Sequence, residues 1–264
     1  MTTEARKRSN VLITGASSGI GADLARVFAR EGHELVLVAR SRERLHELAR
    51  ELRDAHGATA RVLPIDLSVS GAASALHDLA LREGVEVDVL VNDAGFGMRG
   101  PFVELDPARQ LEMIQVNLVA LTELTRLFVP DMLRRGAGRI LNVASTAAFQ
   151  PGPLMAVYCA TKAYVLSFSE ALAEELRGSG VTVTCVTPGA TETGFGEIAG
   201  VAATRLFRSG TMSSSSVAEA AYAATSKGVP LAVPGCRNRL LAGSVRFLPI
   251  PMAARVARLF LENA

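Results

Sequence analysis

Tryptophan is absent from this chain of 264 residues, and aromatic residues make up only 5% of it, although 49% of the residues are hydrophobic. A core built from aliphatic side chains is therefore expected, and the length is enough for one large α/β domain or two small ones. The sequence also lacks a run of about 18 uninterrupted apolar residues, so we expect no transmembrane segment.

The chain also lacks a large excess of one charge: it has 28 Lys and Arg and 26 Asp and Glu, which gives a net charge of +2. This balance argues against nucleic acid as the main partner and favours a small molecule. The three cysteines show no CxxC pairing, and we predict no metal site. The basic stretch MTTEARKRSN leads into a short apolar run and a glycine-rich turn rather than a cleavage site, so a cytoplasmic location is expected.

Short runs rich in β-branched residues alternate with amphipathic segments along the chain. This rhythm is typical of an α/β fold in which a mostly parallel sheet is covered by helices on both faces. Without an internal repeat or a linker, residues 1–264 are predicted to form a single domain. Strands are predicted at 11–14, 34–39, 59–65, 87–92, 139–145, 181–187 and 231–233, and helices near 19–31, 42–55, 70–83, 107–135, 156–177 and 217–227.

Three segments depart from this rhythm. Residues 1–8 are predicted to be an N-terminal arm. The tract 189–216 is rich in Gly, Thr and Ser, and we predict a lid over a site with one short helix near 199–207, or else a mobile loop without function. Residues 236–264 are predicted to be a helical extension that packs on a partner subunit or forms a wall of the pocket. Contact of its last helix with a membrane surface is the alternative.

A glycine-rich turn, TGASSGIG at residues 14–21, lies between the first predicted strand and the first predicted helix. Glycine permits a tight turn and a close approach of backbone N–H groups to a phosphate, and the positive end of the following helix favours the same anion. Its spacing is G-x-x-x-G-x-G, and its place between strand and helix indicates a dinucleotide site rather than a plain structural turn. The cofactor-binding residues predicted here are Gly15, Ser17, Ser18, Gly19 and Ile20.

The residue that ends the second predicted strand bears on the choice of cofactor. An NAD-preferring site usually has an acid there that binds the ribose hydroxyls, whereas this chain has Arg40. Because a guanidinium suits a 2′-phosphate, we predict NADP(H) in preference to NAD(H). The alternative is that Arg40 only caps the surface or stacks on adenine.

Tyr158 and Lys162 are four residues apart in a predicted helix, so their side chains share one face. A tyrosine that exchanges protons near neutral pH needs its pKa lowered by about three units, and we expect Lys162 and a cationic cofactor ring to supply this. Ser145 ends the strand predicted at 139–145, where its hydroxyl would hold a substrate oxygen. On spacing alone, such a Tyr–Lys pair is more often an ordinary surface pair.

Taken in order, these motifs resemble the short-chain dehydrogenase/reductase superfamily in its compact single-domain form, over residues 9–235. The resemblance implies a three-layer, doubly wound Rossmann fold with a mostly parallel seven-stranded sheet. The matching positions are TGASSGIG at 14–21, Asp66-Leu67, Asn92-Asp93-Ala94-Gly95, Asn117, Ser145, Tyr158-x-x-x-Lys162, and Pro188-Gly189 followed by Thr193.

The resemblance implies four catalytic residues. Tyr158 would exchange the proton, while Lys162 would hold the nicotinamide ribose and tune Tyr158. Ser145 would steady the substrate oxygen. Asn117 would support a water relay through the helix that carries it; a buried core asparagine is the alternative.

The resemblance also implies cofactor contacts, among them the adenine contacts of Asp66 and Leu67. Asp93 stands where the family usually has a second asparagine, so a role that needs an amide donor is not carried over to it. A purely structural hydrogen-bond acceptor is the alternative for Asp93. The cofactor-binding residues implied are Asp66, Leu67, Asn92, Ala94, Gly95, Tyr158, Lys162, Pro188, Gly189, Thr191 and Thr193.

The sequence therefore predicts an NADP(H)-dependent oxidoreductase that interconverts a carbonyl and an alcohol on a small or medium, apolar substrate. A catalytically silent dinucleotide-binding regulatory protein of the same fold is the alternative, although a sensor has no need for Tyr158 and Lys162 together. A homodimer or homotetramer is implied by the resemblance, and the identity of the substrate is not. The apolar pocket residues predicted are Phe96, Met98, Phe149, Pro151, Leu154, Met155 and Phe195.

Overall fold

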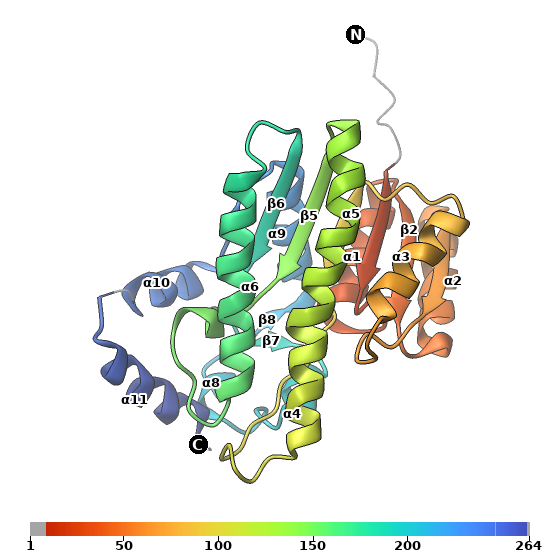
Figure 1. Ribbon diagram of the computed structural model, residues 1–264. Helices are drawn as coiled ribbons and strands as arrows, with labels where there is room; N and C mark the ends of the chain where they lie inside the picture. Colours follow the sequence, from red (N-terminus) through yellow and green to blue (C-terminus); the bar gives the residue numbers. More distant parts are fainter. Residues whose placement is uncertain (1–8, 246, 263–264) are drawn as a thin grey trace.

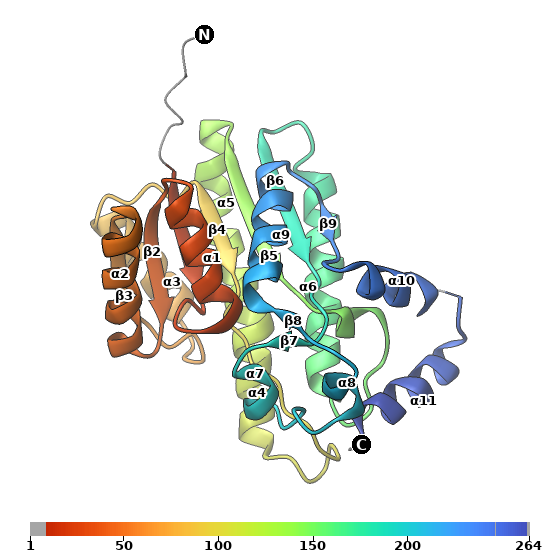
Figure 2. The same ribbon diagram turned by 180° about the vertical axis from the view of Figure 1, so that it is seen from behind.

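A seven-stranded parallel sheet forms the middle layer of the molecule, with helices on both of its faces (Figures 1 and 2). The computed structural model describes residues 9–245 and 247–262, so the N-terminal arm expected at 1–8 lies outside the described residues. The strand order is β3-β2-β1-β4-β5-β6-β9, which confirms the doubly wound α/β fold. The strands are β1 (Asn10–Thr14), β2 (Glu34–Ala39), β3 (Ala60–Pro64), β4 (Val89–Asn92), β5 (Gly138–Val143), β6 (Val181–Val186) and β9 (Leu231–Ala232).

Each face of the sheet has its own apolar core. Helices α1 (Gly19–Arg30), α2 (Arg42–His56) and α9 (Ser214–Ser226) cover the face that is nearer in Figure 2. Helices α3 (Ala72–Arg82), α5 (Leu121–Arg135) and α6 (Ala156–Glu175) cover the other face. Because both faces are covered, the central strands are almost wholly buried, and the middle of β1 and most of β4 are apolar.

The helix predicted at 107–135 is not regular. It consists of α4 (Pro107–Ile114), a π-helical segment at Gln115–Ala120 and α5, which follow one another without a break. Its start is as expected, since the Asp106 side chain accepts a hydrogen bond from the Ala108 N–H at 2.9 Å and Pro107 occupies the first turn. The π-helical segment carries Asn117, whose buried amide bonds outside its own helix.

The tract 189–216 has more structure than the sequence predicts. It holds a two-stranded parallel pair, β7 (Thr191–Glu192) and β8 (Met212–Ser213), and two one-turn helices, α7 (Phe195–Ile198) and α8 (Arg205–Arg208). The single helix predicted near 199–207 is therefore wrong. The four serines that suggested a loop instead open α9, because the Ser213 hydroxyl accepts the Ser216 N–H at 3.3 Å.

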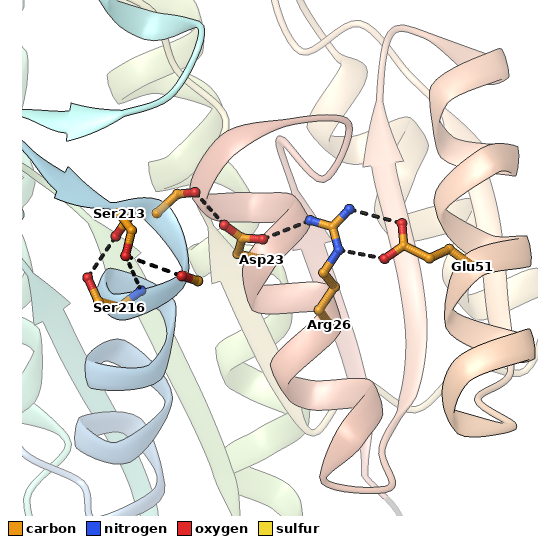
Figure 3. A network of polar contacts seen from close by, with 7 residues as sticks. Asp23, Arg26, Glu51, Ser213 and Ser216 are labelled. Carbon is orange, nitrogen blue, oxygen red and sulfur yellow. Dashed lines mark hydrogen bonds and ion pairs between the residues drawn. The ribbon is translucent and has the colours of Figure 1, made fainter.

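A chain of polar contacts ties the start of α9 to α1 and α2 (Figure 3). Ser214 donates its hydroxyl to Asp23, which also accepts from Arg26 at 2.7 Å. Arg26 in turn makes a two-pronged contact with Glu51, at 2.7 and 2.9 Å. The end of the tract 189–216 is thus fixed to the helix that follows the glycine-rich turn.

The C-terminal extension forms α10 (Cys236–Val245) and α11 (Ile250–Leu261), which project beside the sheet in both views (Figures 1 and 2). The extension predicted at 236–264 is thus helical, and its second helix begins directly after Pro249. Among the described residues, no helix is both long enough and apolar enough to cross a membrane.

Candidate active site

A cleft of about 620 Å³ lies at the carboxyl edge of the sheet. The segments that line it follow directly after β1, β2, β3, β4, β5 and β6. The carboxyl ends of parallel strands meet at one edge, which is where open α/β sheets bind ligands. Predicted site residues on its wall are Gly15, Ser17, Ser18, Gly19, Ile20, Arg40, Asp66, Leu67, Ala94, Gly95, Ser145, Tyr158, Lys162, Pro188, Gly189, Thr191 and Thr193.

The glycine-rich turn is packed so closely that side chains are excluded. A Cβ on Gly15 would lie 2.8 Å from the Ala94 nitrogen, and the φ of Gly15 is +74°. A Cβ on Gly21 would lie 2.5 Å from the Gly15 carbonyl oxygen. The glycine-rich turn is therefore packed against the turn that follows β4. The backbone of the glycine-rich turn lines the cleft at the start of α1. Such a cradle of backbone groups at a helix N-terminus fits a pyrophosphate.

Asp93 is held inside this arrangement, and sequence reasoning left its role open. Its backbone N–H donates to the Thr14 hydroxyl at 3.1 Å, while its carboxylate accepts the Gly21 N–H. Burial raises the pKa of Asp93 to about 7, against the opposing effects of the Lys162 charge and the Gly21 N–H. Asp93 is therefore a hydrogen-bond acceptor between the two turns, and it also lines the cleft, so a purely structural role stays a prediction.

Asp93→Asn should change how stability depends on pH. An acid whose folded pKa lies above its unfolded value binds more protons when folded, so its contribution to stability falls as pH rises between the two values. The neutral, isosteric amide removes this loss, so the stability of the variant relative to wild type should rise between about pH 4 and pH 7. Urea unfolding at several pH values measures the difference, with Asp54→Asn on the exposed side of α2 as the control. A difference between Asp93→Asn and wild type that stays constant with pH would contradict this account.

Two charged residues stand at the far end of the cleft. Arg40 is 66% exposed and its guanidinium lies 3.7 Å from the Glu112 carboxylate. Burial alone would raise the pKa of Asp66, but hydrogen bonds from Ser68 and the charges of Arg40 and Arg109 lower it. Asp66 therefore stays ionised and can accept a hydrogen bond from a ligand amino group.

Tyr158, Lys162 and Ser145 meet in the middle of the cleft. Tyr158 is only 7% exposed, and its ring packs against Phe195 with 5.2 Å between centroids. The Lys162 ammonium lies 5.8 Å from the centre of the Tyr158 ring and donates to the Val143 carbonyl at 2.8 Å. Ser145 lies two residues beyond β5 rather than at its end, and it accepts the Ala147 N–H at 3.1 Å.

The expected lowering of the Tyr158 pKa is not found in the chain itself. Burial raises the pKa of Tyr158, the hydrogen bond with Ser145 opposes this, and the nearby Asp93 adds to the rise. Burial also lowers the pKa of Lys162, although Asp93 acts against that change. Spacing shows which groups are neighbours but not how far they are desolvated, and desolvation is the larger effect here.

Two predicted asparagines are close to the site but do not line the cleft. The Asn92 amide is buried and donates to Asn142 at 2.9 Å and to Thr125 at 3.2 Å, so it joins β4, β5 and α5, and a contact of Asn92 with a cofactor stays a prediction. Asn117 accepts the Phe96 N–H at 3.1 Å and donates to the Phe96 carbonyl at 3.0 Å. Asn117 thereby fixes the turn that brings Gly95 into the cleft.

The segment after β6 faces the glycine-rich turn across the cleft. A Cβ on Gly19 would lie 3.0 Å from the Thr193 methyl group. The Thr193 hydroxyl accepts the Phe195 N–H at 3.2 Å, and the Thr191 hydroxyl donates to the Gly189 carbonyl at 2.9 Å. These bonds shape the segment that closes the cleft opposite the start of α1.

The sequence identified the apolar wall only in part. Phe96, Met155 and Phe195 line the cleft as predicted. Met98 and Leu154 instead line a separate small cavity, and Phe149 and Pro151 line neither. The missing part of the wall comes from the C-terminal extension, for which sequence reasoning had kept three alternatives. The cleft residues that it supplies are Arg237, Asn238, Leu241, Ala242, Ser244, Val245, Leu248, Ala253, Val256, Ala257, Phe260 and Leu261.

The chain matches one known protein family over most of its length. The family model described as short chain dehydrogenase matches residues 9–199, which is more than half of the chain. The chain belongs to the short-chain dehydrogenase family. The match contains the glycine-rich turn, Ser145, Tyr158 and Lys162, whereas the part of the cleft wall that comes from the C-terminal extension lies outside it.

Individual relatives agree with the family. This short-chain dehydrogenase is 38% identical over 179 residues to the ketoacyl reductase HetN of Nostoc sp., covering 68% of this chain and 62% of that protein. It is 35% identical over 183 residues to a very-long-chain 3-oxoacyl-CoA reductase of Anas platyrhynchos, covering 67% of this chain and 58% of that protein. The chain thus spans less than two thirds of the length of either relative.

A solved structure is similar over a larger share of the chain. A short-chain dehydrogenase from Sphingobium yanoikuyae in complex with NADPH has a TM-score of 0.81 and 37% identity, covering 90% of this chain and 94% of that one. At this TM-score and coverage, this short-chain dehydrogenase and the Sphingobium protein share the same overall fold.

Proposed function

We propose that this short-chain dehydrogenase is an NADP(H)-dependent oxidoreductase that interconverts a carbonyl and an alcohol on a small or medium, apolar substrate. The observation that carries the proposal is the meeting of Tyr158, Lys162 and Ser145 in the cleft that the glycine-rich turn opens into. When bound, a nicotinamide cofactor supplies the hydride, which no side chain can provide. The protein residues supply orientation and the proton.

Burial suits Tyr158 to the role of proton donor. Because burial raises the pKa of Tyr158, the protonated phenol is favoured and is ready to donate to a carbonyl oxygen during reduction. The Ser145 hydroxyl, which interacts with Tyr158, can donate a second hydrogen bond to the same oxygen. The Lys162 charge stabilises the phenolate that remains, and the Val143 carbonyl fixes the ammonium.

The choice of cofactor rests on Arg40, supported by the NADPH in the Sphingobium structure. Arg40 is exposed at the rim of the cleft, and Arg44 lines the same end. The contact between the Arg40 guanidinium and the Glu112 carboxylate, at 3.7 Å, is too long to be a strong bond. The guanidinium is therefore free to turn toward a 2′-phosphate. The planar guanidinium of Arg40 can donate two hydrogen bonds to the oxygens of such a phosphate.

Arg40→Asp should reverse the preference between the two cofactors. Loss of a charge-assisted contact of about 1.5–3 kcal/mol, with a carboxylate that repels the 2′-phosphate, should raise the KM for NADPH by about 10- to 100-fold. The same carboxylate can accept from the ribose hydroxyls of NADH, so the KM for NADH should fall. Arg50→Asp, an equal change of charge at an exposed position of α2, is the control. If Arg40→Asp kept the preference of the wild type for NADPH over NADH, the assignment of NADP(H) would be wrong.

The enzymatic proposal is tested by NADPH oxidation across a panel of ketones, aldehydes and 3-oxoacyl thioesters. Turnover of an apolar member of the panel is expected. Tight NADPH binding without turnover of any carbonyl would instead support the regulatory protein kept as the alternative. A cytoplasmic location and a homodimeric or homotetrameric state remain predictions, and sedimentation measures the second of these.

A further inference from the structure

The C-terminal extension carries an unusual density of exposed apolar side chains. Phe247 is 89% exposed, Leu240 is 75% exposed and Ile250 is 71% exposed. A scattered exposed leucine needs no explanation, but a gathered set of large apolar side chains marks an interaction surface. We call this set the C-terminal apolar surface; its members are Leu240, Leu241, Phe247, Leu248, Ile250, Met252, Val256, Leu259 and Phe260.

On α11 these side chains form one stripe. Met252, Val256, Leu259 and Phe260 follow the spacing i, i+4, i+7, i+8 and are all between 43% and 53% exposed. The helix also has a buried side, at Ala253 and Leu261, which packs on the protein. The exposed stripe is therefore a second apolar face that the described part of the chain leaves in contact with solvent.

The charge of this region has one sign. Between residues 236 and 261 the sequence has five arginines and no aspartate or glutamate. Arg239 and Arg255 are exposed, and in the described part of the chain neither has an acidic side chain within ion-pair distance. Arg258 pairs with Glu262 at 3.1 Å. Arginines beside an apolar stripe can extend to the headgroups while the stripe enters the acyl boundary.

The same surface continues into the cleft. Leu241, Leu248, Val256 and Phe260 belong to the C-terminal apolar surface and also line the cleft. The two helices lie at the edge of the molecule in both views, away from the helix layers on the sheet (Figures 1 and 2). An occupant that covers this surface would therefore lie at the mouth of the cleft.

We propose that α10 and α11 dock the protein on the surface of an anionic lipid bilayer, with the mouth of the cleft facing the lipid. A second copy of the chain fits less well, because a two-fold contact would place this wholly basic segment against itself. An anionic headgroup layer complements the arginines, and the acyl boundary takes the apolar stripe.

Vesicle sedimentation with the full chain tests the proposal, without substrate or cofactor, so that its outcome is separate from that of the activity test. The chain should pellet with phosphatidylcholine vesicles that contain phosphatidylglycerol, pellet far less with phosphatidylcholine alone, and be released by salt. Arg239→Glu combined with Arg255→Glu should weaken binding about tenfold or more. Ile250→Ser combined with Leu259→Ser should weaken it on both kinds of vesicle.

The matched control is Arg50→Glu combined with Arg82→Glu, the same change of charge at exposed positions of α2 and α3. It should bind as the wild type does, and thermal unfolding of each variant checks that the fold is retained. Equal loss in both charge-reversal variants would overturn the proposal, as would wild-type protein that does not bind anionic vesicles. A dimer that dissociates in Ile250→Ser with Leu259→Ser, without vesicle binding by the wild type, would show that a second copy covers this surface.

Discussion

Tyr158→Phe should lower kcat/KM for carbonyl reduction with NADPH by about 10³-fold, because general acid–base catalysis by one side chain is worth about 10²- to 10⁴-fold. The substitution removes only the hydroxyl. The ring contact with Phe195 and the burial of the side chain remain, so the cleft keeps its shape. The loss should therefore fall mainly on kcat, with little change in the KM for NADPH.

The physical basis of this prediction is the environment of the phenol. Burial favours the protonated form of Tyr158, and in the structure Ser145 is the hydroxyl group that interacts with it. Water or Ser145 can still donate a hydrogen bond in the variant, but the alkyl hydroxyl of Ser145 is a much weaker acid than a phenol, and a water is not held in place as the packed Tyr158 ring is. Residual activity well below the wild-type rate is the expected consequence.

A second tyrosine in the same helix provides the control for Tyr158→Phe. The Tyr164 hydroxyl lies 3.0 Å from the Thr122 hydroxyl, outside the cleft, and the ring stacks on Phe168. Tyr164→Phe removes an equivalent atom and should keep kcat/KM close to that of the wild type. Steady-state kinetics on the best carbonyl of the panel measures both variants. Near-wild-type activity in Tyr158→Phe would overturn the assignment of the proton donor.

Gly21→Ala is expected to lower both the stability of the protein and its affinity for the cofactor. Gly21 lies within α1, where alanine normally stabilises a helix by about 1 kcal/mol relative to glycine. Here the new Cβ would lie 2.5 Å from the Gly15 carbonyl oxygen and 2.6 Å from the Asp93 carboxylate. Both obstacles belong to packed turns, so the overpacking cost of about 1–3 kcal/mol should exceed the gain in helix propensity.

The displaced turn should also bind NADPH at least about tenfold more weakly, since each 1.4 kcal/mol changes a dissociation constant tenfold. Gly243→Ala is the matched control, because Gly243 is helical too and a Cβ there would have nothing within 4 Å. That variant should be neutral or slightly more stable. Denaturant unfolding and NADPH titration measure the two quantities, and equal behaviour of the two variants would contradict the packing argument.

The part of the site that sequence predicts well is the part that follows a strand. Gly15, Arg40, Asp66 and Ser145 each come soon after an apolar run, and parallel strands bring such residues to one edge whatever the helices between them do. Their convergence follows from topology and needs no knowledge of side-chain packing. For this reason the cleft is where the sequence placed it.

Features that depend on packing were missed. One-turn helices such as α7 and α8 are too short to show a period, so the tract 189–216 read as a loop. A pocket wall formed by the C-terminal extension is among the alternatives predicted from the sequence, but it is selected only by contacts between distant parts of the chain, such as the hydrogen bond from Arg99 to the Leu261 carbonyl at 2.6 Å. The direction of the Tyr158 pKa depends on burial, which spacing does not reveal.

The π-helical segment at Gln115–Ala120 has a consequence for how this chain can change in evolution. A π-turn holds an extra residue relative to an α-turn, so deletion of one residue there would restore a regular α-helix without breaking it. Because the wide turn absorbs the extra residue, the two flanks of the helix would keep nearly the same alignment after such a deletion. The change would be local: Asn117 would shift on the helix surface and would no longer face the Phe96 backbone. A deletion that is favourable for the helix would thus cost the hydrogen bonds that fix the turn at Gly95.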